Sequence, residues 1–160
     1  MTEAGYPNGF AMDMVVAYPP RAIFEVVSAN LAQIGVKLNL IEQTYATSTT
    51  GWREGRVPLL AAAWGSYGIA DVALSTSNFF KGGADDQAQN PEVVTLLKAA
   101  DSSVDAPFRK QKYEQALKII AAQAYWVPLW NHSLSYAQTN TVNFSVDADE
   151  FPRFYKASWK

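Results

Sequence analysis

Four consecutive residues at the end of the most apolar run of the chain have side chains that suit a pocket for a small solute. Trp64 closes the predicted strand 57–64, and Gly65, Ser66 and Tyr67 follow it. Tryptophan and tyrosine offer flat apolar faces, the two hydroxyls orient a ligand, and glycine lets a ligand approach the backbone. Ligands of open α/β sheets bind beyond the carboxyl ends of the strands. The sequence therefore predicts a ligand-binding site at these four residues.

Two further residues are candidates for the same site. Asp71 is the next acid along the chain, and it can anchor a ligand amine or simply cap a loop. Tyr45 follows a predicted strand end, where it lines the cleft or is a half-buried loop aromatic. Trp64 also has a plain structural interpretation, as a core residue followed by a turn at Gly65. Both interpretations stand for each residue.

The residue types exclude several other chemistries. The chain has no cysteine and one histidine, His132, so neither a thiolate site nor a multi-histidine metal site is predicted. No nucleophile-elbow pattern accompanies His132, and Gly82-Gly83 lacks the lysine and hydroxyl of a phosphate loop. We therefore predict no catalytic residue, no metal and no cofactor.

Charged residues offer only weak candidates. Arg53 can meet a ligand carboxylate, although an exposed helical arginine is the commoner case. The acid pair Asp85-Asp86 is interpreted as a solvated face rather than as a catalytic pair. The net charge is −2, with acidic and basic residues mixed and no basic stripe, so no nucleic-acid partner is predicted.

The elements that position these residues follow from apolar spacing. A strand is predicted over 11–18, and a helix after Pro19-Pro20 whose buried face recurs at three- and four-residue spacing up to Gly35. The remaining predictions are a strand from Val36, a short helix within 44–55, the strand 57–64, a loop over 65–83 with or without a short helix, helices beginning at Asn90-Pro91 and Asp105, strands over 127–130 and 134–137, and a weaker strand over 142–146. Alternating strands and helices favour one α/β domain with a mainly parallel, mixed sheet flanked by helices.

Nothing in the sequence predicts a membrane span, because no run of about 18 apolar residues occurs. The first five residues lack the basic start and apolar core of an export signal. If the protein is exported, we expect this chain to be a piece that begins after the signal.

Several stretches, taken in order, resemble family 5 of the bacterial extracellular solute-binding proteins, which serve oligopeptide, dipeptide and nickel importers. They are Glu3 to Phe10, Leu31 to Leu38, Trp64-Gly65, Asn90 to Val93 with Leu96-Leu97, the set Arg109, Tyr113, Ala116, Ile119 and Val127-Pro128-Leu129, and Phe151 to Tyr155 with Trp159. Each motif alone is weak, but their order and spacing together cover almost the whole chain.

The resemblance implies a periplasmic-binding-protein-like II fold of which this chain is one lobe. Residues 1–150 are then the carboxy-terminal ligand-binding lobe, and 151–160 is a closing segment that packs on an amino-terminal lobe outside this chain. The implied function is capture of a peptide-like or other small amphipathic solute for an ABC importer, without chemistry, in the periplasm or at the cell surface. The implied partners are the ligand, the other lobe and the membrane permease.

One departure from the family leaves the ligand open. Peptide binders of the family carry an Ala-Asp-Tyr stretch after this tryptophan, whose aspartate pairs with the peptide amine, whereas this chain has Ser66-Tyr67-Gly68 and offers Asp71 in its place. Two other functions remain as alternatives, a ligand-sensing regulatory module built on the same lobe and a small hydrolase.

Overall fold

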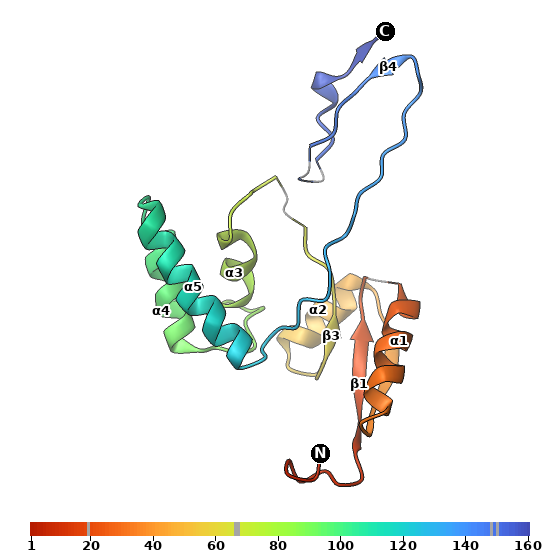
Figure 1. Ribbon diagram of the computed structural model, residues 1–160, viewed down its shortest axis with the longest axis vertical. Helices are drawn as coiled ribbons and strands as arrows, with labels where there is room; N and C mark the ends of the chain where they lie inside the picture. Colours follow the sequence, from red (N-terminus) through yellow and green to blue (C-terminus); the bar gives the residue numbers. More distant parts are fainter. Residues whose placement is uncertain (19, 66–67, 148, 150) are drawn as a thin grey trace. The chain divides into compact units, whose positions relative to one another are not determined.

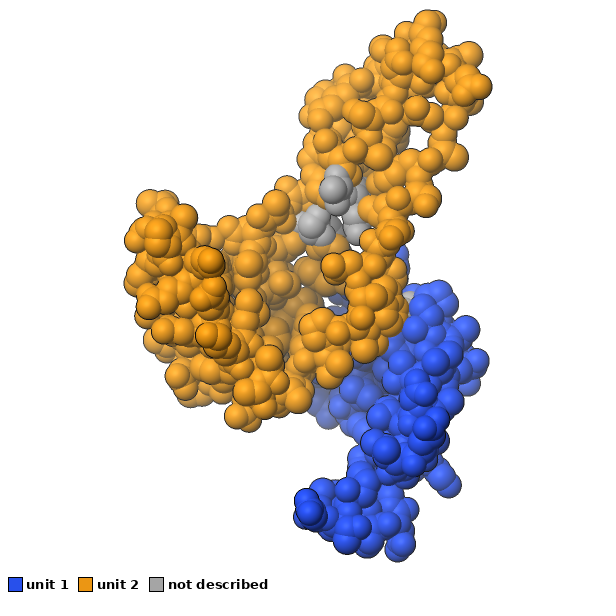
Figure 2. Space-filling view, viewed as in Figure 1, with its two compact units in different colours: residues 1–63 blue, residues 64–160 orange. Residues whose placement is uncertain are grey.

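The computed structural model describes residues 1–18, 20–65, 68–147, 149 and 151–160. The chain divides into two compact units, Met1–Ala63 and Trp64–Lys160 (Figures 1 and 2). Within the described residues, no helix combines the length and the apolar character needed to cross a membrane.

The first unit alternates strands and helices as the apolar pattern predicts. Its elements are β1 (Phe10–Val16), α1 (Arg21–Ala32), β2 (Val36–Glu42), α2 (Tyr45–Arg53) and β3 (Leu60–Ala61). The three strands form one parallel sheet in the order β2–β1–β3. The α/β fold class, with a parallel sheet flanked by helices, is therefore confirmed.

The sheet of the first unit is built around β1, which has a neighbour on each edge. It pairs with β2 from Phe10↔Val36 onward and with β3 only at its end, in the register Val15↔Leu60. The core between the sheet and α1 consists of Met14, Val16, Phe24, Val36, Leu38 and Ala61. The carboxyl end of β1 is thus the best buried part of the sheet.

Two glycines let the chain enter β1 and β2 side by side. Gly9 and Gly35 have φ angles of +74° and +87°, which residues with a side chain rarely adopt. A Cβ atom built on Gly9 would lie 2.0 Å from the carbonyl oxygen of Gly35. That same oxygen accepts a hydrogen bond of 3.0 Å from the amide of Phe10. Backbone contact at this point therefore starts the parallel ladder.

Two predictions for the first unit need correction. The predicted strand 57–64 is reduced to Leu60–Ala61, because β1 ends at the residue that pairs with Ala61 and offers no partner beyond it. Ile34, predicted on the buried face of the first helix, is 58% exposed. It lies past the end of α1, in the turn before β2, so helical spacing no longer applies to it.

The second unit is mainly helical. Its elements are α3 (Ala73–Phe79), α4 (Pro91–Asp101), α5 (Ala106–Ala122), β4 (Val142–Asn143), the short 3-10 helix η1 (Phe154–Lys156) and β5 (Ser158–Trp159). Helices α4 and α5 lie side by side in Figure 1, and β4 pairs with β5 in antiparallel fashion. The core of the unit consists of Phe80, Val93, Leu97, Ala100, Tyr113, Ala116 and Ile120.

Helix α4 begins where its capping residues predict. The Asn90 side chain accepts hydrogen bonds from the amides of Glu92 and Val93 at 3.0 and 3.2 Å, and Pro91 occupies the first turn. The predicted buried face is confirmed, since Val93, Leu97 and Ala100 are at most 1% exposed.

The buried face of α5 is shifted from the prediction. Tyr113 and Ile120 are buried as predicted, but Leu117 is 42% exposed and Ala116 is fully buried in its place. Ala124, the last residue of the predicted stripe, lies beyond the helix with a φ angle of +51°. The small Ala116 side chain permits close approach to α4, which a leucine at the same place does not.

The predicted strands 127–130 and 134–137 are wrong for this chain. Residues 126–140 form no strand and all of them are exposed. A β-strand requires a neighbour for its amide and carbonyl groups, and none of the described residues pairs with this stretch. The weaker prediction over 142–146 corresponds to the two-residue strand β4.

Candidate functional site

The Trp64 ring packs against a neighbouring aromatic ring and stays partly accessible to solvent. Its ring meets Phe79 at 4.9 Å between centroids with the planes at 82°, an edge-to-face contact. Phe79 in turn lies 4.5 Å from Trp126, which also contacts Phe80 of the core. Trp64 is 37% exposed. It is therefore joined to the core through a series of aromatic rings without being a core residue, and an accessible ring is what the ligand interpretation requires.

The residues that follow Trp64 are described only in part. Gly65 is half-buried, whereas Ser66 and Tyr67 lie outside the described residues. Gly68 has a φ angle of +78°, and a Cβ atom there would meet Phe151 and Asp149 at 3.7 and 3.8 Å. Gly68 thus lies beside the segment that carries Asp149.

Asp71 has internal partners on both carboxylate oxygens. Its Oδ1 accepts a hydrogen bond of 2.8 Å from the amide of Ala73, in the first turn of α3. Its Oδ2 accepts one of 2.5 Å from the Arg109 guanidinium. The first contact is the loop cap that the alternative interpretation of Asp71 describes, and the second is an ion pair with a residue of α5.

A polar cluster connects α3, α4 and α5 beneath Asp71. The Tyr113 hydroxyl donates to Asp101 at 2.5 Å and lies 3.5 Å from Asp71. Asp101 also accepts hydrogen bonds from Ser77 and from the amine of Lys81. Three donors therefore converge on one carboxylate at the end of α4.

The pKa values of this cluster follow from its contacts. Burial alone would raise the pKa of the Asp101 carboxyl, but hydrogen bonds from Lys81, Tyr113 and Ser77 outweigh it and lower the pKa below 3.8. Burial and the hydrogen bond to Asp101 raise the pKa of Tyr113 above its usual 10.0. At neutral pH the Tyr113 phenol therefore keeps its proton and donates a hydrogen bond to the ionised Asp101 carboxylate.

Tyr45 belongs to the first unit. It is the first residue of α2, it is 53% exposed, and Thr44 before it accepts a hydrogen bond from the amide of Thr47. Arg53 is exposed in the last turn of the same helix, where a cation is favourable. A ligand role for Tyr45 stays a prediction.

The structure brings Trp64 and Asp71 to the same short helix. Asp71 caps the first turn of α3, and Trp64 contacts Phe79 at its last residue. Sequence reasoning noted Arg109 and Tyr113 only as part of a family pattern. Their four-residue spacing, which places two helical side chains on one face, was the signal that could have found them.

The structure corrects the interpretation of the acid pair Asp85-Asp86 as a solvated face. Asp86 is 1% exposed instead of solvated, because its carboxylate accepts hydrogen bonds from the amides of Gly82, Ala88 and Gln89. It shapes the turn before α4.

His132 is exposed, and its ring lies edge-on to that of Trp130 with 5.8 Å between the ring centroids.

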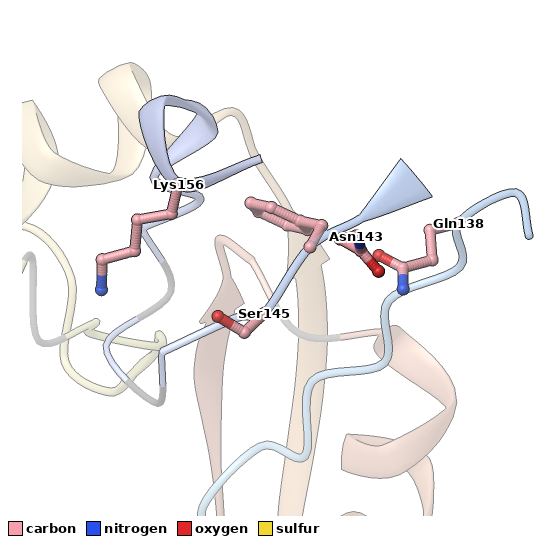
Figure 3. A pocket seen from close by; sticks show the side chains of 5 residues that line it. Gln138, Asn143, Ser145 and Lys156 are labelled. Carbon is pink, nitrogen blue, oxygen red and sulfur yellow. The ribbon is translucent and has the colours of Figure 1, made fainter. Parts of the chain in front are cut away.

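A second group of polar side chains lines a hollow of about 330 Å³ beside β4 (Figure 3). Its lining residues are Gln138, Asn143, Phe144, Ser145 and Lys156. Lys156 also pairs with Asp147 at 3.0 Å. Arg153 bridges Asp147 and Asp149, and its hydrogen bond to Asp149 lowers the pKa of that carboxyl to about 2. These charges hold the segment after β4 together.

Comparison with known proteins identifies relatives of the chain. No protein-family model matches it. Heme-binding protein A of Haemophilus influenzae is 32% identical over 151 residues, which cover 86% of this chain and 27% of that protein. A dipeptide binding protein of Pseudoalteromonas sp. SM9913, solved in complex with Met-Leu, is 28% identical with a TM-score of 0.67, over 76% of this chain and 26% of that one.

A further solved structure shares the fold over nearly the whole length. HbpA2 of Haemophilus parasuis covers 99% of this chain and 34% of its own, with a TM-score of 0.74 and 23% identity. The relatives and structural neighbours are solute-binding proteins of family 5, and this chain corresponds to a part of them. It spans less than a third of the length of the relatives that it matches.

Proposed function

We propose that this chain is one lobe of the substrate-binding component of an ABC importer and helps to capture a peptide-like or other small amphipathic solute. The observation that carries the proposal is the sequence relationship to a heme-binding protein and a dipeptide-binding protein, over most of this chain. The accessible Trp64, whose ring contacts Phe79 at the last residue of α3, supports it as a place where a solute stacks.

The proposed mechanism is capture without chemistry. A ligand held between two lobes stabilises the closed conformation, since only that conformation makes both sets of contacts. The relatives are binding proteins rather than enzymes, and we extend this property to the present chain. Residues 1–150 are then the ligand-binding lobe, and 151–160 packs on the other lobe.

The proposed setting follows from the same relationship. Binding proteins of ABC importers work in the periplasm or at the cell surface and deliver their ligand to a membrane permease. We propose the same location and the same partner here. The candidate ligand-contacting residues remain those predicted from the sequence, which are Trp64, Gly65, Ser66, Tyr67 and Asp71 and, separately, Tyr45 of the first unit.

Native mass spectrometry of the purified protein tests the proposal. We expect a bound small molecule whose mass disappears on denaturation, or binding of a probe from a panel that includes hemin and the dipeptide Met-Leu. One lobe supplies only part of the contacts, so the affinity of this chain alone should be weak. Trp64→Ala should reduce it by roughly fivefold, because stacking on an aromatic ring contributes about 1 kcal/mol.

The matched control is Trp159→Ala, which removes a tryptophan that is 82% exposed in the closing segment. No bound molecule, together with no binding across the panel, would count against solute capture and favour a sensing or interaction module. Equal loss in both variants would remove Trp64 from the site.

A further inference from the structure

Helix α3 is short, and polar contacts hold it at both ends. At its beginning, Asp71 accepts from the amide of Ala73 and from Arg109. Near its other end, Ser77 and Lys81 both donate to Asp101. A helix of seven residues has little stability of its own, so these contacts and its packing must fix its position.

The Arg109 guanidinium is held independently of Asp71. Its Nη1 donates to the carbonyl oxygens of Ala100 and Ser103 at 3.1 and 3.3 Å, at the end of α4. It also lies 5.3 Å from the centre of the Tyr113 ring. Because these contacts fix the cation on the α4–α5 pair, its ion pair with Asp71 joins the loop before α3 to that pair.

Tyr113 joins the two ends of this arrangement. Its hydroxyl donates to Asp101 at 2.5 Å, and it lies 3.4 Å from Arg109 and 3.5 Å from Asp71. The side chain is 6% exposed, so the phenol has a defined orientation. Both contacts of α3 with the larger helices therefore meet at one residue.

We propose that Arg109 and Tyr113 are positioning residues that fasten the loop 68–72, and through α3 the Trp64 ring, to the α4–α5 pair. This inference rests on the proposed function, because it assigns Asp71 to the placement of a loop that the proposed function takes to contact the ligand. Both oxygens of Asp71 already accept hydrogen bonds within the chain. Asp71 therefore has a structural role at this loop that involves no ligand amine.

Amide hydrogen exchange tests the positioning role without any ligand. Arg109→Met should speed exchange at Ala73, Leu74 and Thr76 by roughly tenfold, because local opening no longer breaks an ion pair. Arg109→Lys should restore part of the protection. Tyr113→Phe, a milder change that keeps the ring, should act in the same direction.

The control is Lys110→Met, at the neighbouring cation on α5, whose side chain is 77% exposed and pairs with Glu114 one turn away at 3.8 Å. It should leave exchange at these amides unchanged. Unaltered exchange in Arg109→Met would overturn the proposal. Exchange that rises equally throughout α4 and α5 would overturn it as well, since Arg109 would then support only the helix pair.

A pair of peptides distinguishes positioning from direct contact with an amine. Asp71→Asn should weaken binding of Met-Leu and of N-acetyl-Met-Leu by the same factor. A loss confined to the free amine would make Asp71 an amine anchor and overturn this part of the proposal. If the unaltered protein carries no bound molecule and binds no member of the panel, the proposed function fails, and the exchange measurement still decides whether Arg109 positions the loop.

Discussion

The helix pair α4–α5 and the stretch 126–137 both carry many large apolar side chains, but only the helix pair buries them. Leu97 and Ala116 are fully buried between the helices. In the second stretch, Val127 is 72% and Leu129 is 52% exposed. A helix satisfies its backbone hydrogen bonds internally and needs only one apolar face to be covered, whereas a strand needs a neighbour for the backbone itself.

This difference in burial shows which parts of the fold the chain specifies with its own residues. The helix pair is local in sequence, because only a few residues separate the end of α4 from the start of α5. The stretch 126–137 has the composition of a strand and no strand beside it among the described residues. Four measurements, given in order of decreasing effect, test how sharp this contrast is.

Amide exchange should show the largest contrast. Hydrogen exchange at the amides in the middle of α4 and α5 should require global unfolding, so their free energy of opening should be on the order of 5 kcal/mol or more. Those of 127–137 should exchange close to the rate of an unfolded chain. Hydrogen exchange followed by mass spectrometry measures both regions in one sample. Strong protection of 127–137 would mean that these residues do find a partner.

A pair of leucine substitutions should differ next most. Leu97→Ala should reduce the free energy of unfolding by about 2–5 kcal/mol, because it leaves a cavity in the core. Leu129→Ala should change it by no more than about 0.5 kcal/mol, since that side chain is largely exposed. Urea denaturation of both variants provides the comparison. Equal effects would show that Leu129 is buried in solution.

A pair of tyrosine substitutions extends the same comparison to a buried and an exposed polar group. Tyr113→Phe removes the hydroxyl that donates to Asp101 and should cost about 1–2 kcal/mol. Tyr136→Phe, at a side chain that is 45% exposed, should be nearly neutral. Thermal unfolding detects the difference. A neutral Tyr113→Phe would indicate that water replaces the phenol at Asp101.

The smallest effect concerns pH. The folded protein lowers the pKa of Asp101, so this group contributes stability above its unfolded pKa near 3.8, and that stability is lost as the pH falls through the lowered value. The contribution should be below about 1 kcal/mol. Asp101→Asn should therefore flatten the acid side of the stability profile. Asp149→Asn, in the segment after β4, should leave the unfolding of the helix pair unchanged, and a matching flattening there would contradict this assignment.

Local signals allowed much of the fold to be predicted. The start of α4 at Asn90-Pro91 and the strand that begins at Val36 depend on neighbours in sequence, and each was confirmed. The length of β3 and the fate of 127–137 depend on whether another strand lies alongside. Sequence periodicity carries no information about that partner.

The candidate site was predictable only in part. The end of an apolar run pointed to Trp64, whose ring is partly exposed, and its ligand role stays a prediction. The partner of Asp71 lies 38 residues away in sequence, on a helix whose orientation no local pattern defines. The buried state of Asp86 was missed for a different reason. Its partners are backbone amides of a turn, and the types of the neighbouring residues do not reveal them.

The contact between Gly9 and Gly35 sets a limit on how this chain can vary during evolution. A side chain at Gly9 would occupy the place of the Gly35 carbonyl oxygen, so the two backbones would have to separate. Separation would break the hydrogen bond from Phe10 with which the β1–β2 ladder begins. Selection that keeps the sheet should then keep both glycines as a pair. We expect an alignment of relatives to show the two positions retained together, or lost together where the sheet begins elsewhere.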